Sequence, residues 1–134
     1  MGVQLTKDSI DLGIVVRDPE RSLAFYRDVL GFTSAGDNPM PGGSHMWRLM
    51  CGTSMIKLLR FEREPQGSAT PGSIGKAFGY RYWTITVSNL AEVVAAAEAA
   101  GHKIPVAPVD IRPGVRIAMI EDPDGNWVEL LEAS

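Results

Sequence analysis

The stretch DLGIVVRDPERSLAFYRDVLGF (11–32) decides the fold, because it joins a strand to a helix with clear signals at both ends. Its first residues alternate in polarity, which is typical of a strand with one buried face. The buried face would consist of Ile10, Leu12, Ile14 and Val16. Asp18 can accept backbone N–H groups at a helix start, and Pro19 suits the first helical position. We therefore expect a helix from Pro19 to about Leu30, ended by Gly31.

The same pattern recurs 71 residues later in the chain. YRYWTITV (80–87) predicts a strand, and residues 90–100 predict a helix that Asn89 can cap. SMIKLL (54–59) and NWVELL (126–131) correspond at an offset of 72. Each half of the chain therefore reads as one strand, one helix and three further strands.

The repeat predicts an α+β fold of two βαβββ modules in a single domain, residues 1–134. Module 1 covers about 8–61, a linker rich in Gly, Pro and Ser covers 62–79, and module 2 covers about 80–132. The modules would form a curved, cup-shaped mixed sheet with the helices on its outer face. The segment DNPMPGG (37–43) is interpreted as a mobile loop near the cup.

Period-two alternation predicts which side chains line the cup. Asp11, Gly13 and Val15 would face it from the first strand, and Tyr82, Thr84 and Thr86 from the repeat. The last strands would add Met55, Lys57 and Leu59 in module 1, and Trp127, Glu129 and Leu131 in module 2. Four polar residues, one per strand, would then converge there: Asp11, Lys57, Tyr82 and Glu129.

Two stretches carry a resemblance to a known family: 11–32 and IEDPDGNWVELL (120–131), with a weaker match over 82–101. They resemble the vicinal oxygen chelate superfamily, also called the glyoxalase/bleomycin-resistance/dioxygenase fold. The resemblance implies one metal ligand at each of four positions, usually His, Glu or Gln, His and Glu. Here those positions hold Asp11, Lys57, Tyr82 and Glu129, and only Glu129 is a usual ligand. An ammonium such as that of Lys57 has no lone pair. We therefore expect no resident cofactor; if a divalent metal binds, Asp11 and Glu129 would be its ligands.

The resemblance implies an enzyme of lyase or isomerase type that acts on a small oxygenated metabolite, without the usual four-ligand metal site. Glu129 would be the general acid or base and Lys57 would stabilise negative charge, while Tyr82 and Asp11 would orient the substrate or relay a proton. Substrate-binding residues would be Trp127, Arg48, Thr84 and Met55. The alternative is a metal-free protein of the bleomycin-resistance type that sequesters a small molecule.

Structural roles without catalysis stay open for the same residues. Lys57 and Glu129 fit an ion pair across the cup as well as an acid/base pair. Tyr82 is interpreted as a core aromatic side chain with its hydroxyl group hydrogen-bonded, in slight preference to a proton donor. Arg48 would clamp a carboxylate if it points into the cup, and would otherwise lie on the surface.

Composition excludes several other classes of protein. The net charge is −3 and no basic stripe is visible, which argues against nucleic acid as a partner. No apolar run is long enough to cross a membrane, and the first ten residues lack the features of a signal peptide. The single cysteine, Cys51, suits a reducing cytoplasm. The resemblance also implies a homodimer.

Overall fold

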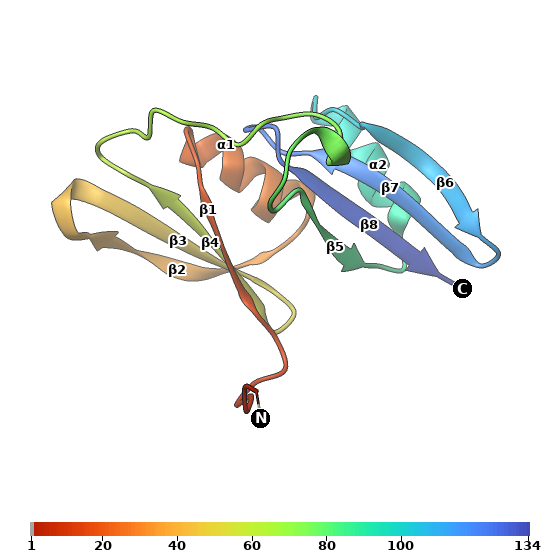
Figure 1. Cartoon of the computed structure of the whole chain (residues 1–134), viewed down its shortest axis with the longest axis horizontal. Helices are drawn as coiled ribbons and strands as arrows, with labels where there is room; N and C mark the ends of the chain where they lie inside the picture. Colours follow the sequence, from red (N-terminus) through yellow and green to blue (C-terminus); the bar gives the residue numbers. More distant parts are fainter. Residues whose placement is uncertain (1) are drawn as a thin grey trace. The chain divides into compact units, whose positions relative to one another are not determined.

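The computed structural model describes residues 2–134 and divides into two compact units, Met1–Gln66 and Gly67–Ser134. Figure 1 shows that each unit has its own sheet and its own helical segment. The two sheets are four-stranded and mixed, and they have the same strand order when the second unit is counted from its own first strand. Two βαβββ modules are therefore confirmed. The single-domain boundaries and the placement of the helices outside a cup stay predictions.

The first unit begins with β1 (Asp11–Val15) and α1 (Pro19–Leu23), which continues as a π-helical segment, Ala24–Val29. The strands β2 (Thr33–Met40), β3 (Ser44–Cys51) and β4 (Ser54–Arg60) follow. Their order in the sheet is β1-β4-β3-β2, with β1 parallel to β4 and the other pairs antiparallel. The last strand of the module is therefore flanked by the first strand and by β3.

The second unit opens with a 3-10 turn, Ile74–Lys76, followed by β5 (Tyr82–Thr86) and α2 (Leu90–Ala99). The strands β6 (Val106–Arg112), β7 (Val115–Glu121) and β8 (Trp127–Ala133) complete it. The sheet order is β5-β8-β7-β6, again with one parallel pair, β5 with β8. The repeat read from the sequence is thus a repeat of topology.

Each unit has a separate apolar core. In the first, the aromatic side chains of the helical segment pack closely: Phe25 meets Tyr26 edge-on at 4.8 Å between ring centroids, and Tyr26 stacks on Phe32 at 6.2 Å. Leu58 of β4 is fully buried, and α1 packs against this strand. In the second unit, α2 packs against β7, β6 and β8. Its buried side chains include Leu90, Val94, Ala97, Ala118, Ile120, Val128 and Leu130.

The two helices begin in different ways. The Asp18 side chain accepts hydrogen bonds from the backbone N–H groups of Glu20 and Arg21 at 3.1 and 3.3 Å, so the predicted cap is confirmed. The predicted Asn89 cap is wrong, because this side chain caps no backbone group and instead donates to Glu92 at 3.2 Å. Glu132 of β8 accepts the Leu90 N–H at 2.9 Å. A carboxylate from the sheet, and not the residue before the helix, therefore caps the first backbone N–H group of α2.

Two further expectations need correction. Ile10 precedes β1 and is 71% exposed, so it does not belong to the buried face. Residues 37–40 belong to β2 and pair with β3, and only 41–43 form a turn, so the predicted loop is mostly strand. The end of the linker is held by Arg81, the residue before β5. Arg81 donates to the carbonyl groups of Thr70, Ser73 and Ile74 at 2.7–3.2 Å.

Candidate functional site

The first unit gathers its polar candidate residues on one face of its sheet. Asp11, Gly13 and Val15 pair with Met55, Lys57 and Leu59, and Lys57 pairs with Arg48 on its other side. Paired residues of neighbouring strands point to the same face. We call this surface the Lys57 face, and it consists of Asp11, Gly13, Val15, Met46, Arg48, Met50, Met55, Lys57 and Leu59. The alternate β4 residues Ile56 and Leu58 are buried, as the alternation predicted.

Asp11 is the only carboxylate of the Lys57 face, and two ammonium groups contact it. Lys57 Nζ lies 3.3 Å from Oδ2, and Lys7 Nζ donates to Oδ1 at 2.7 Å. The Lys7 hydrogen bond, followed by the Lys57 contact, lowers the pKa of Asp11 below its ordinary value, with desolvation opposing it. The side chains of Asp11 and Lys57 remain about one-third exposed, 35% and 34%. Asp11 therefore stays charged and holds Lys57 in place.

Arg48 lies directly across from Lys57, in the middle of β3. Its Nη1 donates to the side-chain oxygen of Asn38, and a Cβ at Gly36 would come within 3.3 Å of its Nη2. The guanidinium therefore reaches toward β2, while the Lys57 ammonium reaches the other way toward β1. Arg48 is half-buried on the Lys57 face and is not a solvated surface residue.

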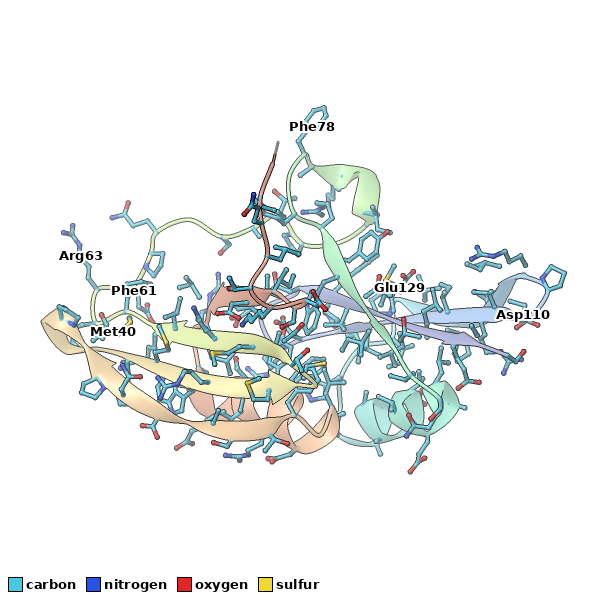
Figure 2. The ribbon with its side chains drawn as sticks, turned by 90° about the horizontal axis from the view of Figure 1, so that it is seen from below. Met40, Phe61, Arg63, Phe78, Asp110 and Glu129 are labelled. Atoms are coloured by element: carbon cyan, nitrogen blue, oxygen red, sulfur yellow. The ribbon has the colours of Figure 1, made fainter. Side chains whose placement is uncertain are left out.

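The second unit has an equivalent surface around Glu129, which Figure 2 labels on β8. We call it the Glu129 face, and it consists of Tyr82, Thr84, Thr86, Ile117, Met119, Glu121, Trp127, Glu129 and Leu131. Thr84 pairs with Glu129 in the sheet and donates its hydroxyl to Oε1 at 2.7 Å. Within residues 2–134 no donor is recorded for Oε2. Glu129 is thus half-buried and oriented by one hydrogen bond, which leaves Oε2 open.

Trp127 and Tyr82 flank Glu129 on this face, and they differ in burial. Trp127 is partly buried and donates from Nε1 to Glu121 at 3.2 Å. Tyr82 pairs with Trp127 but is 44% exposed, so its interpretation as a core aromatic residue is wrong.

Glu121 was missed by the sequence analysis, and it brings a second carboxylate to the Glu129 face. Lys103 lies 3.9 Å from it. The turn from Asp122 to Asn126 sets the pairing of Glu121 with Trp127. The length of this turn is therefore the sequence signal that could have placed Glu121 on the same face as Trp127.

The residues present do not fit the four-ligand metal site that the resemblance implies. Lys57 cannot donate an electron pair, and both oxygens of Asp11 already contact ammonium groups. In the described part of the chain, no three His, Cys, Asp or Glu side chains lie together as a metal would require. His45 instead contacts Asp37 at 2.6 Å and packs on Trp47. Burial raises the pKa of the Cys51 thiol, which suits a packing role.

The sequence carries enough of this pattern to place the protein in a family. The chain matches the model of the Glyoxalase/Bleomycin resistance protein/Dioxygenase superfamily over residues 9–130, and it belongs to that superfamily, whose members commonly use divalent metals. It is 32% identical to the virulence protein STM3117 of Salmonella typhimurium, over 96% of this chain and 86% of that protein. The predicted family is therefore confirmed.

Solved structures give the same fold. A glyoxalase family protein from Bacillus cereus superimposes with a TM-score of 0.84 at 21% identity, covering 98% of this chain and 96% of that one. A lactoylglutathione lyase from Agrobacterium tumefaciens superimposes with a TM-score of 0.63 at 24% identity, covering 92% and 91%. At these identities the likeness establishes the fold alone. Among residues 2–134, no helix has the length and apolar character needed to span a membrane.

Proposed function

We propose that this chain is an enzyme of lyase or isomerase type that moves a proton in a small oxygenated metabolite, with Glu129 as the general base and acid. The proposal is based on the position and hydrogen bonding of the Glu129 carboxylate. Its carboxylate sits in mid-strand among Met119, Trp127 and Leu131, with Thr84 bound to Oε1 and Oε2 open. A carboxylate with one oxygen fixed and the other available can accept a proton from a bound substrate.

In the reaction that we propose, Glu129 takes the proton from a carbon atom next to a carbonyl group and returns it to a neighbouring atom. The substrate is isomerised, and no oxidant or reductant is required. Thr84 would keep the carboxylate in one orientation, and Trp127 and Tyr82 would contact the substrate. Met55 stays a predicted substrate contact.

Positive charge would stabilise the oxygen atom that becomes negative in this step, and Lys57 is the residue that the resemblance implies for this role. Asp11 would act as its positioning residue through the contact at 3.3 Å. A fixed ammonium can stabilise an enolate oxygen without a metal ion, and we propose that the protein works without the usual four-ligand site. Lys57 and Glu129 belong to different units, and a direct ion pair between them stays a prediction.

A second candidate function, sequestration of a small molecule without chemistry, is favoured by the apolar part of the Lys57 face. Three methionines, Met46, Met50 and Met55, lie on it with Leu59. Their flexible thioether side chains adapt to ligands of varied shape. The same experiment separates the two functions, since sequestration predicts binding without proton exchange.

The test is hydrogen exchange in deuterated water, because it detects proton abstraction even when no net product accumulates. A panel of small 2-oxo and 2-hydroxy carbonyl compounds would be incubated with the protein and followed by proton NMR. S-lactoylglutathione belongs in the panel, since one structural neighbour is named a lactoylglutathione lyase. We expect the wild type to exchange at least one compound faster than buffer does. The Glu129→Gln variant should then be slower by about 10²–10⁴-fold.

Glu98→Gln is the matched control, because Glu98 is an exposed carboxylate on α2 of the same unit. It should exchange substrate at the wild-type rate. Full exchange by Glu129→Gln would remove Glu129 from the mechanism. Binding of a panel compound with no exchange by the wild type would favour sequestration. Each measurement would be repeated with a chelator and with added divalent metal, and activation by metal would contradict the metal-free proposal.

We also propose that the protein is a homodimer in the cytoplasm, as the resemblance implies. Light scattering after size-exclusion chromatography would measure the mass of the particle directly. A mass of one chain would contradict the dimer.

A further inference from the structure

The Lys57 face holds more positive charge than its own residues neutralise. Lys57 and Arg48 are half-buried and face each other across β3 and β4, and Lys7 reaches the same surface. Asp11 is the only carboxylate on this face, and both ammonium groups share it. Like charges directly opposite in a sheet are destabilising. This arrangement therefore needs an explanation beyond the fold.

Arg48 has no anionic partner among the described residues. Its recorded contact is the neutral side-chain oxygen of Asn38, which occupies one of its five N–H donors. Lys57 likewise makes one contact with a carboxylate, that of Asp11. The two cations lean apart, Arg48 toward β2 and Lys57 toward β1, and each is held on its outer side. Donors of both remain available on the face between them.

The two cations lie among apolar residues of the same face. The neighbouring residues on the same face are apolar or lack a side chain: Gly13, Val15, Met46, Met50, Met55 and Leu59. Gly13 leaves space beside Lys57, since a Cβ there would meet nothing closer than a Leu59 methyl group at 3.7 Å. A few polar groups set in an apolar wall are typical of small-molecule sites.

We propose that Arg48 and Lys57 form a subsite for an oxyanion group, a carboxylate or a phosphate, carried by the small-molecule ligand. The planar guanidinium can bind two oxygens of such a group at once, and the ammonium adds a point charge. The inference deepens the proposed function, on which it rests, by naming the substrate class: an anionic metabolite. Arg48 then binds the anionic group and takes no part in proton transfer.

The test is an NMR titration of the full-length ¹⁵N-labelled protein with three probes. Lactate carries a carboxylate, lactamide is its neutral counterpart of nearly the same shape, and inorganic phosphate represents the second source of negative charge. We expect lactate or phosphate to shift the amide signals of β3 and β4 near residues 48 and 57, more weakly as salt is added. Lactamide should shift none of them. The stronger of the two anions identifies the group that the subsite prefers.

Variants then assign the effect to the two cations. Arg48→Gln should weaken anion binding by about tenfold or more, because it removes a charge-assisted hydrogen bond. Arg48→Lys, which keeps the charge and loses the planar fork, should restore part of the affinity. Arg60→Gln is the matched control, since Arg60 is an exposed arginine on the other face of the adjacent strand β4. Asp11→Asn should tighten binding, because it removes the carboxylate that competes for Lys57.

Equal shifts from lactate and lactamide would overturn the proposal, as would equal affinities for Arg48→Gln and Arg60→Gln. The proposal would also be overturned if neither lactate nor phosphate shifted these amide signals. Thermal unfolding of Arg48→Gln would establish that this variant is folded. The titration measures binding on the first unit and needs no turnover. Failure of the titration is therefore distinguishable from failure of the exchange test at Glu129.

Discussion

The Lys57 face and the Glu129 face have the same backbone and opposite chemistry. In both units a residue of the last strand pairs with the third residue of the first strand, Lys57 with Gly13 and Glu129 with Thr84. In one unit that residue of the last strand is a cation beside another cation, Arg48. In the other it is a carboxylate beside a neutral neighbour, Met119. The net charge of −3 lies in the second unit, since the first has equal numbers of acidic and basic residues.

The contrast teaches that the repeat constrains the core and leaves the functional faces free to diverge. Leu58 and Leu130 occupy corresponding positions and both are fully buried. One position earlier in each strand, Lys57 and Glu129 have opposite charge. A buried position must fill a fixed volume, whereas a half-exposed position need only satisfy its charge. Selection for a ligand can therefore act on the faces without disturbing the packing beneath them.

The largest expected effect tests the equivalence of the two cores. Leu58→Ala and Leu130→Ala should each lower the free energy of unfolding by about 2–5 kcal/mol, because each leaves a cavity in a fully buried site. Urea denaturation would measure both. Ile10→Ala, at a position 71% exposed, is the control and should change the stability by about 0.5 kcal/mol or less. A large difference between the two leucine variants would break the equivalence.

A smaller effect distinguishes the two helix starts. Asp18→Ala should cost about 1 kcal/mol, because two backbone N–H groups lose their acceptor. Asn89→Ala should cost less than about 0.5 kcal/mol, since Asn89 caps nothing. Glu132→Ala should cost about 1 kcal/mol or more, because it leaves the Leu90 N–H without its acceptor. A larger loss of stability in Asn89→Ala than in Glu132→Ala would show that Asn89, and not Glu132, caps α2.

The smallest expected effect concerns Asp11, which is solvated. Its pKa is lowered in the folded chain, so its contribution is present above its ordinary pKa of 3.8 and is lost as the pH falls below that value. Asp11→Asn should therefore be slightly less stable than the wild type at pH 6, and the difference should shrink as the pH falls through the lowered pKa of Asp11. The difference at pH 6 should shrink in high salt, because salt screens exposed ion pairs. A difference that did not shrink as the pH fell would show that packing, not charge, sets the role of Asp11.

The sequence predicted well which face of its strand each of these residues occupies, and it predicted the burial of some side chains poorly. Alternation placed Asp11, Lys57, Thr84 and Glu129 correctly, because a strand turns successive side chains to opposite sides whatever lies around it. The burial of Tyr82 was predicted wrongly, because β5 pairs with β8 on one side only. Tyr82 therefore lies at an edge of the sheet, where its side chain is exposed. A sequence pattern gives the face of a residue but not its place in the strand order.

The sequence by itself determined the family, the two βαβββ modules and the strand faces on which Asp11, Lys57, Thr84 and Glu129 lie, because these follow from local periodicity and repetition. Only the tertiary structure decided the partners. Lys57 is held by Asp11, Glu129 by Thr84, Trp127 by Glu121, and the start of α2 by a carboxylate 42 residues away. The physical reason is that hydrogen bonds and ion pairs depend on separations of about 3 Å. Strand order and register fix such separations, and neither is written in any short stretch of the chain.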